Sequence, residues 1–259
     1  MNNETNLSTL NEYPLTEQEV FQQLTLSQIV TKNYRAAGVF EKYSLDFCCK
    51  GNRPLNEVCN EKGLNTEKIL SELENTIQSS HDNPLWFNSW DLDFLVDYII
   101  NVHHRYIHES IPVISAHANK VASVHGNKFP ETVEINKIFT AVYKELKQHM
   151  LKEEEILFPY IKYIFKVNKN ESKAERSYFG TIANPIKMME AEHAKAGDSF
   201  FQIRKLSRNY TPPAEACLTY STYYKELKEF EEDLHKHVHL ENNILFIKAI
   251  ELEKQIFID

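Results

Sequence analysis

Two histidine–glutamate pairs carry the strongest chemical signal in this sequence. His149 and Glu153 form one pair and His237 and Glu241 form the other, with the glutamate four residues after the histidine each time. Residues four apart on a helix lie one turn apart on the same face. Imidazole nitrogen and carboxylate oxygen are both ligands of divalent metal ions. Each pair therefore indicates a helix that presents two metal ligands side by side.

The segments around these pairs are copies of each other, 88 residues apart (237 − 149 = 241 − 153 = 88). Apolar residues flank each pair at helical spacing, so both pairs are expected to point into a helical core. A duplicated two-helix unit explains the repeat. The repeated positions are Val142, Leu146, His149, Glu153, Ile156, Leu157 and Phe158 in the first copy and Phe230, Leu234, His237, Glu241, Ile244, Leu245 and Phe246 in the second.

Two further histidines, His104 and His193, lie on apolar stripes of their own, 89 residues apart (193 − 104 = 89). Four imidazoles and two carboxylates exceed the four ligands of a tetrahedral zinc ion. They suit two metal ions bridged by the carboxylates, with two imidazoles on each ion. Nitrogen and oxygen ligands without thiolate favour iron or manganese, and we predict iron. The predicted ligands are His104, His149, Glu153, His193, His237 and Glu241.

A simpler interpretation applies to most isolated residues of these types. A single His-x-x-x-Glu is usually a solvated pair or a satisfied core histidine, but two matched pairs on apolar stripes disfavour that interpretation here. It does apply to His103, His235 and His239, which are expected to be structural or solvated because they point away from the predicted ligands beside them. Cys59 and Cys217 are expected to be core residues.

Helices are the elements that must position these ligands. The chain has only six glycines and long stretches without Pro or Gly, which favours helices over strands. Helical segments are expected at about residues 90–119, 131–165, 180–208 and 214–250. Four long helices with modest connections predict an all-α protein, an up-down-up-down four-helix bundle.

The chain is expected to divide into two domains. A small helical N-terminal domain is predicted over residues 15–80, with a helix at 27–43. A polar stretch at 78–84 has the composition of a linker. The bundle is predicted over residues 85–252.

Composition argues against several other classes of protein. A net charge of −8 without a basic patch disfavours binding to nucleic acid or to an anionic membrane. No apolar run is long enough to span a bilayer, and the N-terminus lacks the pattern of a secretory signal. The four cysteines include no Cys-x-x-Cys pair, so no disulfide framework is indicated. We therefore expect a cytoplasmic protein.

Several segments resemble the hemerythrin-like di-iron proteins that repair iron–sulfur clusters, the RIC family. A further segment, FEKYSLDFCCKGNRPLNEVC at 40–59, resembles the ScdA-type N-terminal domain of that family, with its adjacent cysteines Cys48 and Cys49. The likeness extends over about residues 20–250, and the combination of motifs is highly specific. The bundle segments are HMLKEEEILFP at 149–159, MEAEHAKAG at 189–197 and HVHLENNILF at 237–246.

The resemblance implies a centre of two iron ions, bridged by an oxo group and by the carboxylates of Glu153 and Glu241. It also implies that Glu192 lies near the centre and supports a ligand. For Cys48 and Cys49 it implies a thiol role, in receiving iron, contacting a client protein or responding to oxidation.

The function implied by the resemblance is repair of iron–sulfur clusters damaged by nitric oxide or peroxide. The partners would be damaged iron–sulfur proteins or a cluster-assembly scaffold, and a homodimer is left open. Two chemistries also stay open. The centre could donate iron to the damaged cluster, or it could bind or reduce nitric oxide or oxygen, which would make the protein an enzyme.

Three other classes fit the motifs less well. True hemerythrins use a His-x-x-x-His pair on one helix, whereas Gly197 stands four residues after His193 here. Fewer ligands leave a more open and labile site than reversible oxygen carriage needs. Ferritin-like iron oxidases use Glu-x-x-His rather than His-x-x-x-Glu. A sensor would carry an output domain, and we expect none after the fourth helix.

Overall fold

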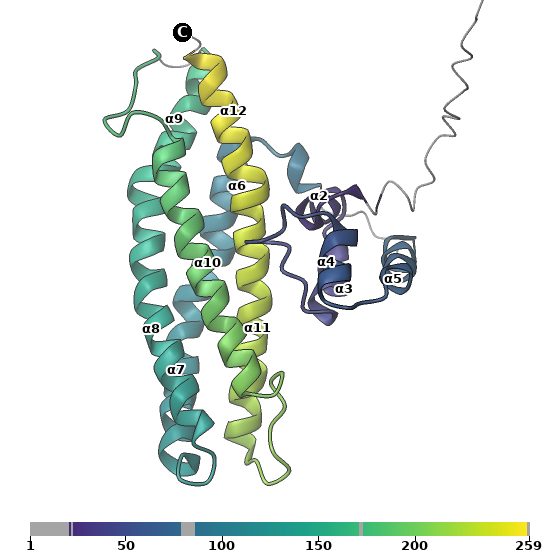
Figure 1. Cartoon of the computed structure of the whole chain (residues 1–259). Helices are drawn as coiled ribbons and strands as arrows, with labels where there is room; N and C mark the ends of the chain where they lie inside the picture. The colour runs from purple at the N-terminus through teal and green to yellow at the C-terminus, as the bar shows by residue number, and fades with distance from the viewer. Residues whose placement is uncertain (1–20, 22, 79–85, 171–172, 258–259) are drawn as a thin grey trace, which may run out of the picture.

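The computed structural model describes residues 21, 23–78, 86–170 and 173–257. Figure 1 shows a long helical bundle with a group of short helices at its side. Apart from two isolated β-bridges, all regular structure in these ranges is helical. The expected linker at 78–84 lies outside the described residues except for Gln78, as does the start of the expected N-terminal domain.

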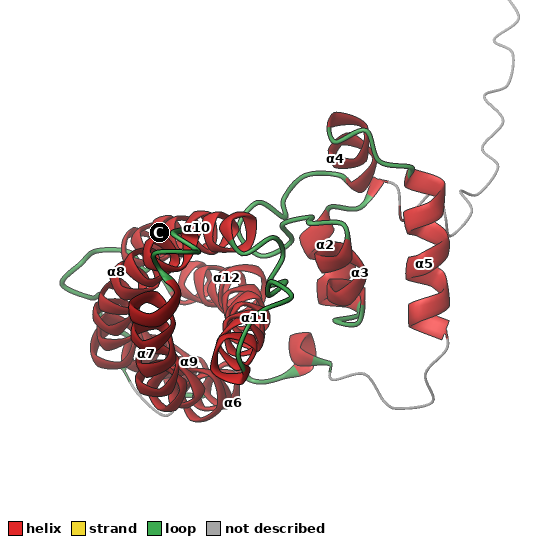
Figure 2. Ribbon diagram, turned by 90° about the horizontal axis from the view of Figure 1, so that it is seen from below, coloured by secondary structure: helices red, strands yellow, loops and turns green. Residues whose placement is uncertain are grey.

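Four helical columns make up the bundle in the described part of the chain, and Figure 2 shows them end-on. Every column except the third consists of consecutive elements with no loop between them. Successive columns run in opposite directions, so the predicted all-α, up-down-up-down bundle is confirmed. The columns are α6 (Leu92–Tyr98), η2 (Ile99–His104) and α7 (Arg105–His125); α8 (Glu131–Lys152), η3 (Glu153–Leu157) and α9 (Phe158–Asn168); α10 (Ala183–Leu206); and α11 (Leu218–Leu240), η4 (Glu241–Leu245) and α12 (Phe246–Ile256).

Three columns contain a short π-helical segment, which the sequence reasoning did not predict. The segment η2 ends at His104, whereas η3 begins at Glu153 and η4 begins at Glu241. A π segment adds one residue to a turn and so changes which residues face the core beyond it. Ile156, expected on the buried stripe, is 38 % exposed, whereas its counterpart Ile244 has the same place in η4 and is buried. Both copies contain the π segment, so the difference comes from what covers the two turns. The expectation for Ile156 was wrong.

Two apolar clusters fill the bundle and leave a polar layer between them. One cluster involves α7, α8, α11 and the end of α10 and continues into the N-terminal segment through residues such as Phe40 and Phe47. The other involves α6, α9, α12 and the start of α10. His193, for example, lies between Met189 of one cluster and Ala196 of the other. Close packing above and below keeps solvent away from most of this layer. None of the described helices is long and apolar enough to cross a membrane.

The N-terminal helices form a separate group beside the fourth column (Figure 2). The helix expected at 27–43 was wrong, because the chain breaks into two helices at Asn33. This residue has an extended backbone, with φ −152° and ψ 108°, and its side-chain oxygen accepts a hydrogen bond from the Arg35 backbone at 3.1 Å. The elements are α2 (Leu26–Lys32), α3 (Ala36–Lys42), α4 (Leu55–Glu61), α5 (Thr66–Gln78) and the 3-10 turn η1 (Phe87–Ser89).

The loop between α3 and α4 attaches this group to the bundle. The side-chain amides of Asn242 and Asn243 in η4 donate hydrogen bonds to the Cys48 carbonyl at 3.2 and 3.3 Å. Phe47 packs edge-on against the ring of His239, with 5.8 Å between centroids. The loop that carries the double cysteine is therefore held against the π segment that begins at the predicted ligand Glu241.

Candidate metal centre

The four predicted histidine ligands point their Nε2 atoms into the polar layer, where they meet in two pairs. Nε2 of His104 lies 3.1 Å from Nε2 of His237, and Nε2 of His149 lies 2.8 Å from Nε2 of His193. All four side chains are buried. Each pair takes one histidine from each copy of the duplicated unit. We call the two sets the His104–His237 position and the His149–His193 position.

The two predicted glutamate ligands face both positions at once. Oε2 of Glu153 lies 3.4 Å from Nε2 of His104, and its Oε1 lies 3.3 Å from Nε2 of His149. Glu241 repeats this arrangement, with its two oxygens 2.9 and 3.1 Å from the other two imidazoles. A carboxylate with one oxygen toward each position has the geometry of a bridge between two metal ions.

The burial of these glutamates tests whether the residues fit such a pair of ions. Both side chains are fully buried, which is costly for a carboxylate without a partner. Neither oxygen of Glu153, and not Oε2 of Glu241, has a hydrogen-bond partner within the described ranges. Two cations would satisfy these oxygens, so the residues fit a two-metal centre. Ligand atoms within 4.8 Å of one another form two groups, His104, Glu153, His237 and Glu241, and His149, Glu153, His193 and Glu241.

Charged glutamates and charged histidines of the centre stabilise each other, and this shifts their pKa values. Burial opposes protonation of His104, but Glu153 and Glu241 outweigh it and raise its pKa to about 10. The same carboxylates overcome burial at His149 and raise its pKa to about 9. Burial and Glu241 would raise the pKa of Glu153, yet the imidazoles hold it at about 2. At His237 burial prevails and the pKa is lowered.

Three of the four imidazoles are oriented by an acceptor at Nδ1. Such outer partners fix the ring and make Nε2 a better ligand. Glu192 is the residue that the family resemblance implied, whereas Glu154 and Asn242 were missed. Both directly follow a predicted bridging glutamate and are 88 residues apart (242 − 154 = 88), which was the available signal. The pairs are His104 with Glu154 at 2.7 Å, His149 with Glu192 at 2.8 Å and His193 with Asn242 at 2.8 Å.

Other histidines and cysteines have structural surroundings. His103 is buried, and its ring stacks on that of His237 with 6° between the planes. His239 is buried as well, so a structural position holds for both of these histidines. Cys59 is buried as expected, but Cys217 is exposed and the expectation of a core position was wrong. Cys217 directly precedes α11 at the end of the bundle, and its sulfur lies 3.3 Å from Nε2 of His125.

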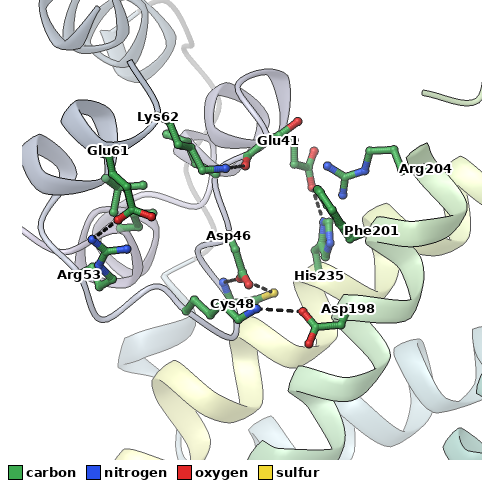
Figure 3. Close-up of a pocket in the computed structure, with 16 residues that line it drawn as sticks. Glu41, Asp46, Cys48, Arg53, Glu61, Lys62, Asp198, Phe201, Arg204 and His235 are labelled. Carbon is green, nitrogen blue, oxygen red and sulfur yellow. Dashed lines mark hydrogen bonds and ion pairs between the residues drawn. The ribbon is translucent and has the colours of Figure 1, made fainter. Parts of the chain in front are cut away.

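The double cysteine lies in a tight loop beside a cleft of about 310 Å³, whose rim is charged (Figure 3). The Asp46 carboxylate accepts hydrogen bonds from the backbone N–H groups of Cys48 and Cys49 at 3.2 and 2.9 Å. The two sulfur atoms lie 3.7 Å apart as free thiols. The Cys49 thiol and burial raise the pKa of Cys48 well above its usual range, which favours the protonated thiol.

One side chain connects this loop with the predicted centre. Oδ1 of Asn242 accepts the hydrogen bond from Nδ1 of His193, and its Nδ2 donates to the Cys48 carbonyl at 3.2 Å. The position of the cysteine loop and the orientation of a predicted metal ligand are therefore linked through a single amide.

Comparison with known proteins agrees with this architecture. Residues 95–249 match the hemerythrin HHE cation-binding domain, and residues 22–77 match the ScdA_N domain, described as a domain of unknown function. A probable iron-sulfur cluster repair protein of Haemophilus influenzae is 34 % identical over 89 % of this chain and 98 % of its own length. The iron-sulfur cluster repair protein YtfE of Escherichia coli is 33 % identical over 87 % of this chain and 96 % of its own.

The chain therefore belongs to the hemerythrin family of cation-binding helical bundles. Within that family it belongs with the two-domain proteins that carry an ScdA-type N-terminus, as the resemblance indicated. The hemerythrin match and the two buried groups of histidine and glutamate bear out the prediction of a di-iron centre.

Proposed function

We propose that this protein repairs iron–sulfur clusters damaged by nitric oxide or peroxide, and that it donates iron held by the six predicted ligands. The observation that carries the proposal is the sharing of ligands. Each position has only two imidazoles of its own, and both depend on the same two buried carboxylates. Iron bound in this way keeps coordination sites for solvent or a bridging oxygen, and is more exchangeable than iron in a closed cage. The names of the relatives support repair as the setting.

A way to the surface exists on one side of the proposed centre. A cavity of about 300 Å³ is lined by His149 and His193 and by the Lys152–Glu192 ion pair. The apolar clusters above and below exclude water from the rest of the layer. In this proposal the buried carboxylates hold the ions, and this cavity is the side from which solvent, a chelating partner or nitric oxide reaches them.

The proposal also covers the parts of the chain that surround the centre. Residues 85–252 would hold the iron, and residues 15–80 would serve the encounter with a client through Cys48 and Cys49. The partners would be damaged iron–sulfur proteins or a cluster-assembly scaffold, with a second copy of this chain as a further candidate. The setting would be the cytoplasm.

Transfer of labelled iron tests donation directly. Protein loaded with ⁵⁷Fe is reduced and mixed with an inactivated cluster enzyme, sulfide and an assembly scaffold. We expect the label in the recovered cluster, as read by Mössbauer spectroscopy. Recovery of the enzyme without the label would contradict donation, and would favour binding or reduction of nitric oxide at the centre instead.

The cysteine pair can be tested in the same assay. The variant C48S/C49S keeps the loop and all six predicted ligands, so its iron content should equal that of the parent protein. We expect slower repair, because in this proposal the two thiols make the contact with the client protein. Equal rates of repair would show that the thiols have no part in it.

A further inference from the structure

The His149–His193 position is supported on both of its imidazoles. Nδ1 of His149 bonds to the Glu192 carboxylate at 2.8 Å. Nδ1 of His193 bonds to the Asn242 side-chain oxygen at 2.8 Å. Both rings are therefore fixed in the tautomer that leaves Nε2 free as a ligand, and both are made more basic there.

The His104–His237 position is supported on only one of its imidazoles. Nδ1 of His104 bonds to Glu154 at 2.7 Å. Nδ1 of His237 is buried and has no hydrogen-bond partner among the residues that the structure describes. A buried N–H without an acceptor is unfavourable, and it leaves Nε2 of that ring less basic.

The difference follows from one substitution in the duplicated pattern. The counterpart of Glu192 in the first copy is His103 (192 − 103 = 89, the interval that also relates the histidines beside them). Nδ1 of His103 is engaged by Asp233 at 2.9 Å. Its ring lies flat against that of His237, with 5.6 Å between centroids. His103 therefore presents only a ring face to His237, whereas its counterpart Glu192 provides a hydrogen-bond acceptor to His149.

We infer that the two metal positions differ in affinity, and that the His149–His193 position fills first and empties last. The ligand sets are the same in kind, so the difference comes from the outer partners. Loss of one such partner typically weakens metal binding by about 10- to 100-fold. The cavity beside the His149–His193 position affects the rate of exchange, whereas the outer hydrogen bonds set the equilibrium. The inference rests on the proposed ligand set, and it identifies the iron of the His104–His237 position as the more weakly held one.

Partial loading tests this order. The full-length metal-free protein is equilibrated anaerobically with one equivalent of Fe²⁺ and crystallised, and iron is located by anomalous diffraction at the iron edge. We expect occupancy at the His149–His193 position about 3- to 10-fold above that at the other position, because two sites that share one equivalent differ in occupancy by the square root of their affinity ratio. Equal or reversed occupancy would overturn the inference and leave the proposed function intact. Absence of iron from both positions would overturn the ligand set and the inference together.

Two variants at Asn242 test the cause. Asn242→Leu removes the acceptor from His193, and should lower the occupancy ratio at one equivalent by about 3- to 10-fold. Asn242→Asp keeps an acceptor, and should hold or raise the ratio. Both variants lose the amide that bonds to Cys48, so they serve as each other's control for the docking of the loop. A similar fall in both would contradict the proposed role of the acceptor.

A third variant should reduce the difference in metal affinity between the two positions. His103→Gln places an amide oxygen where the duplication puts Glu192, within reach of Nδ1 of His237. We expect the occupancy of the His104–His237 position to rise relative to that of the other position. A gain of metal at one position is not an effect that misfolding would produce. No change in the ratio would show that the missing acceptor does not set the affinity.

Discussion

At the scale of single residues, the two buried glutamates matter most to the centre, because each of them faces both metal positions. Glu153 presents one oxygen to each position, and Glu241 does the same. Loss of either carboxylate removes a ligand from both positions together. Glu155, two residues further along, is exposed and has no such role, because its carboxylate is solvated.

We expect Glu153→Leu to lose most of the bound iron and to keep its helix content. Leucine is a good helix former, and it removes a buried charge that would otherwise lack a partner. Glu155→Leu is the matched control, since Glu155 lies two residues further along the same segment, is exposed and carries the same charge. Elemental analysis and far-UV circular dichroism report the two properties. Full iron content in Glu153→Leu would exclude it as a bridging ligand.

At the scale of helices, a buried ion pair connects the third and fourth columns below the centre. Arg204 in α10 donates two hydrogen bonds to Glu231 in α11, at 2.6 Å from Nη2 and 3.0 Å from Nε. The Tyr210 hydroxyl donates to the same carboxylate at 2.8 Å. The side chain of Glu231 is only 5 % exposed. The carboxylate thus depends on its partners, because water cannot replace them.

We expect Arg204→Met to destabilise the protein by about 3–5 kcal/mol, because it leaves the Glu231 charge buried and unpaired. The double variant R204M/E231L should recover much of that loss, since it removes both charges. Urea unfolding of the single and double variants measures the difference. A double variant as unstable as the single one would show that packing, rather than the unpaired charge, dominates.

At the scale of the whole molecule, protons and metal ions compete for the centre. The raised pKa values of His104 and His149, about 10 and about 9, mean that the folded protein without metal holds these imidazoles protonated. Their contribution to stability is full below the ordinary pKa of about 6.5 and is lost as pH rises through the folded values. Metal binding needs the neutral imidazoles, so its affinity rises over the same range.

The metal-free and the iron-loaded protein should therefore differ in how their stability depends on pH. Between about pH 6.5 and pH 9 the metal-free protein should lose stability, by at least about 1 kcal/mol or roughly 2–4 °C in Tm for a chain of this size. The gain in Tm on loading should grow over the same interval. Thermal unfolding of both forms across this range checks the prediction. A metal-free protein that gains stability toward pH 9 would contradict the protonated centre.

The sequence by itself determined which residues gather in the bundle. Helical spacing requires His149 and Glu153 to share a face, and the flanking apolar stripe requires that face to be buried. The duplication extends the same argument to His237 and Glu241. These constraints are local and periodic, so one sequence without relatives was enough to predict the bundle and to bring six side chains to one layer.

Only the tertiary structure decided how that layer is supported. The π segments were not predicted, because an extra residue in a turn shifts the apolar stripe by a single position and the stripe still appears helical. Ile156 is exposed although Ile244 is buried at the same place in its own π segment, so the spacing of the stripe did not decide its burial. The unequal outer partners depend on contacts between columns that are far apart in the sequence, such as His193 with Asn242 and His103 with Asp233. Spacing along one helix carries no information about a hydrogen bond to another. The sequence therefore predicts the ligands, and packing between helices decides which hydrogen-bond partner orients each ligand.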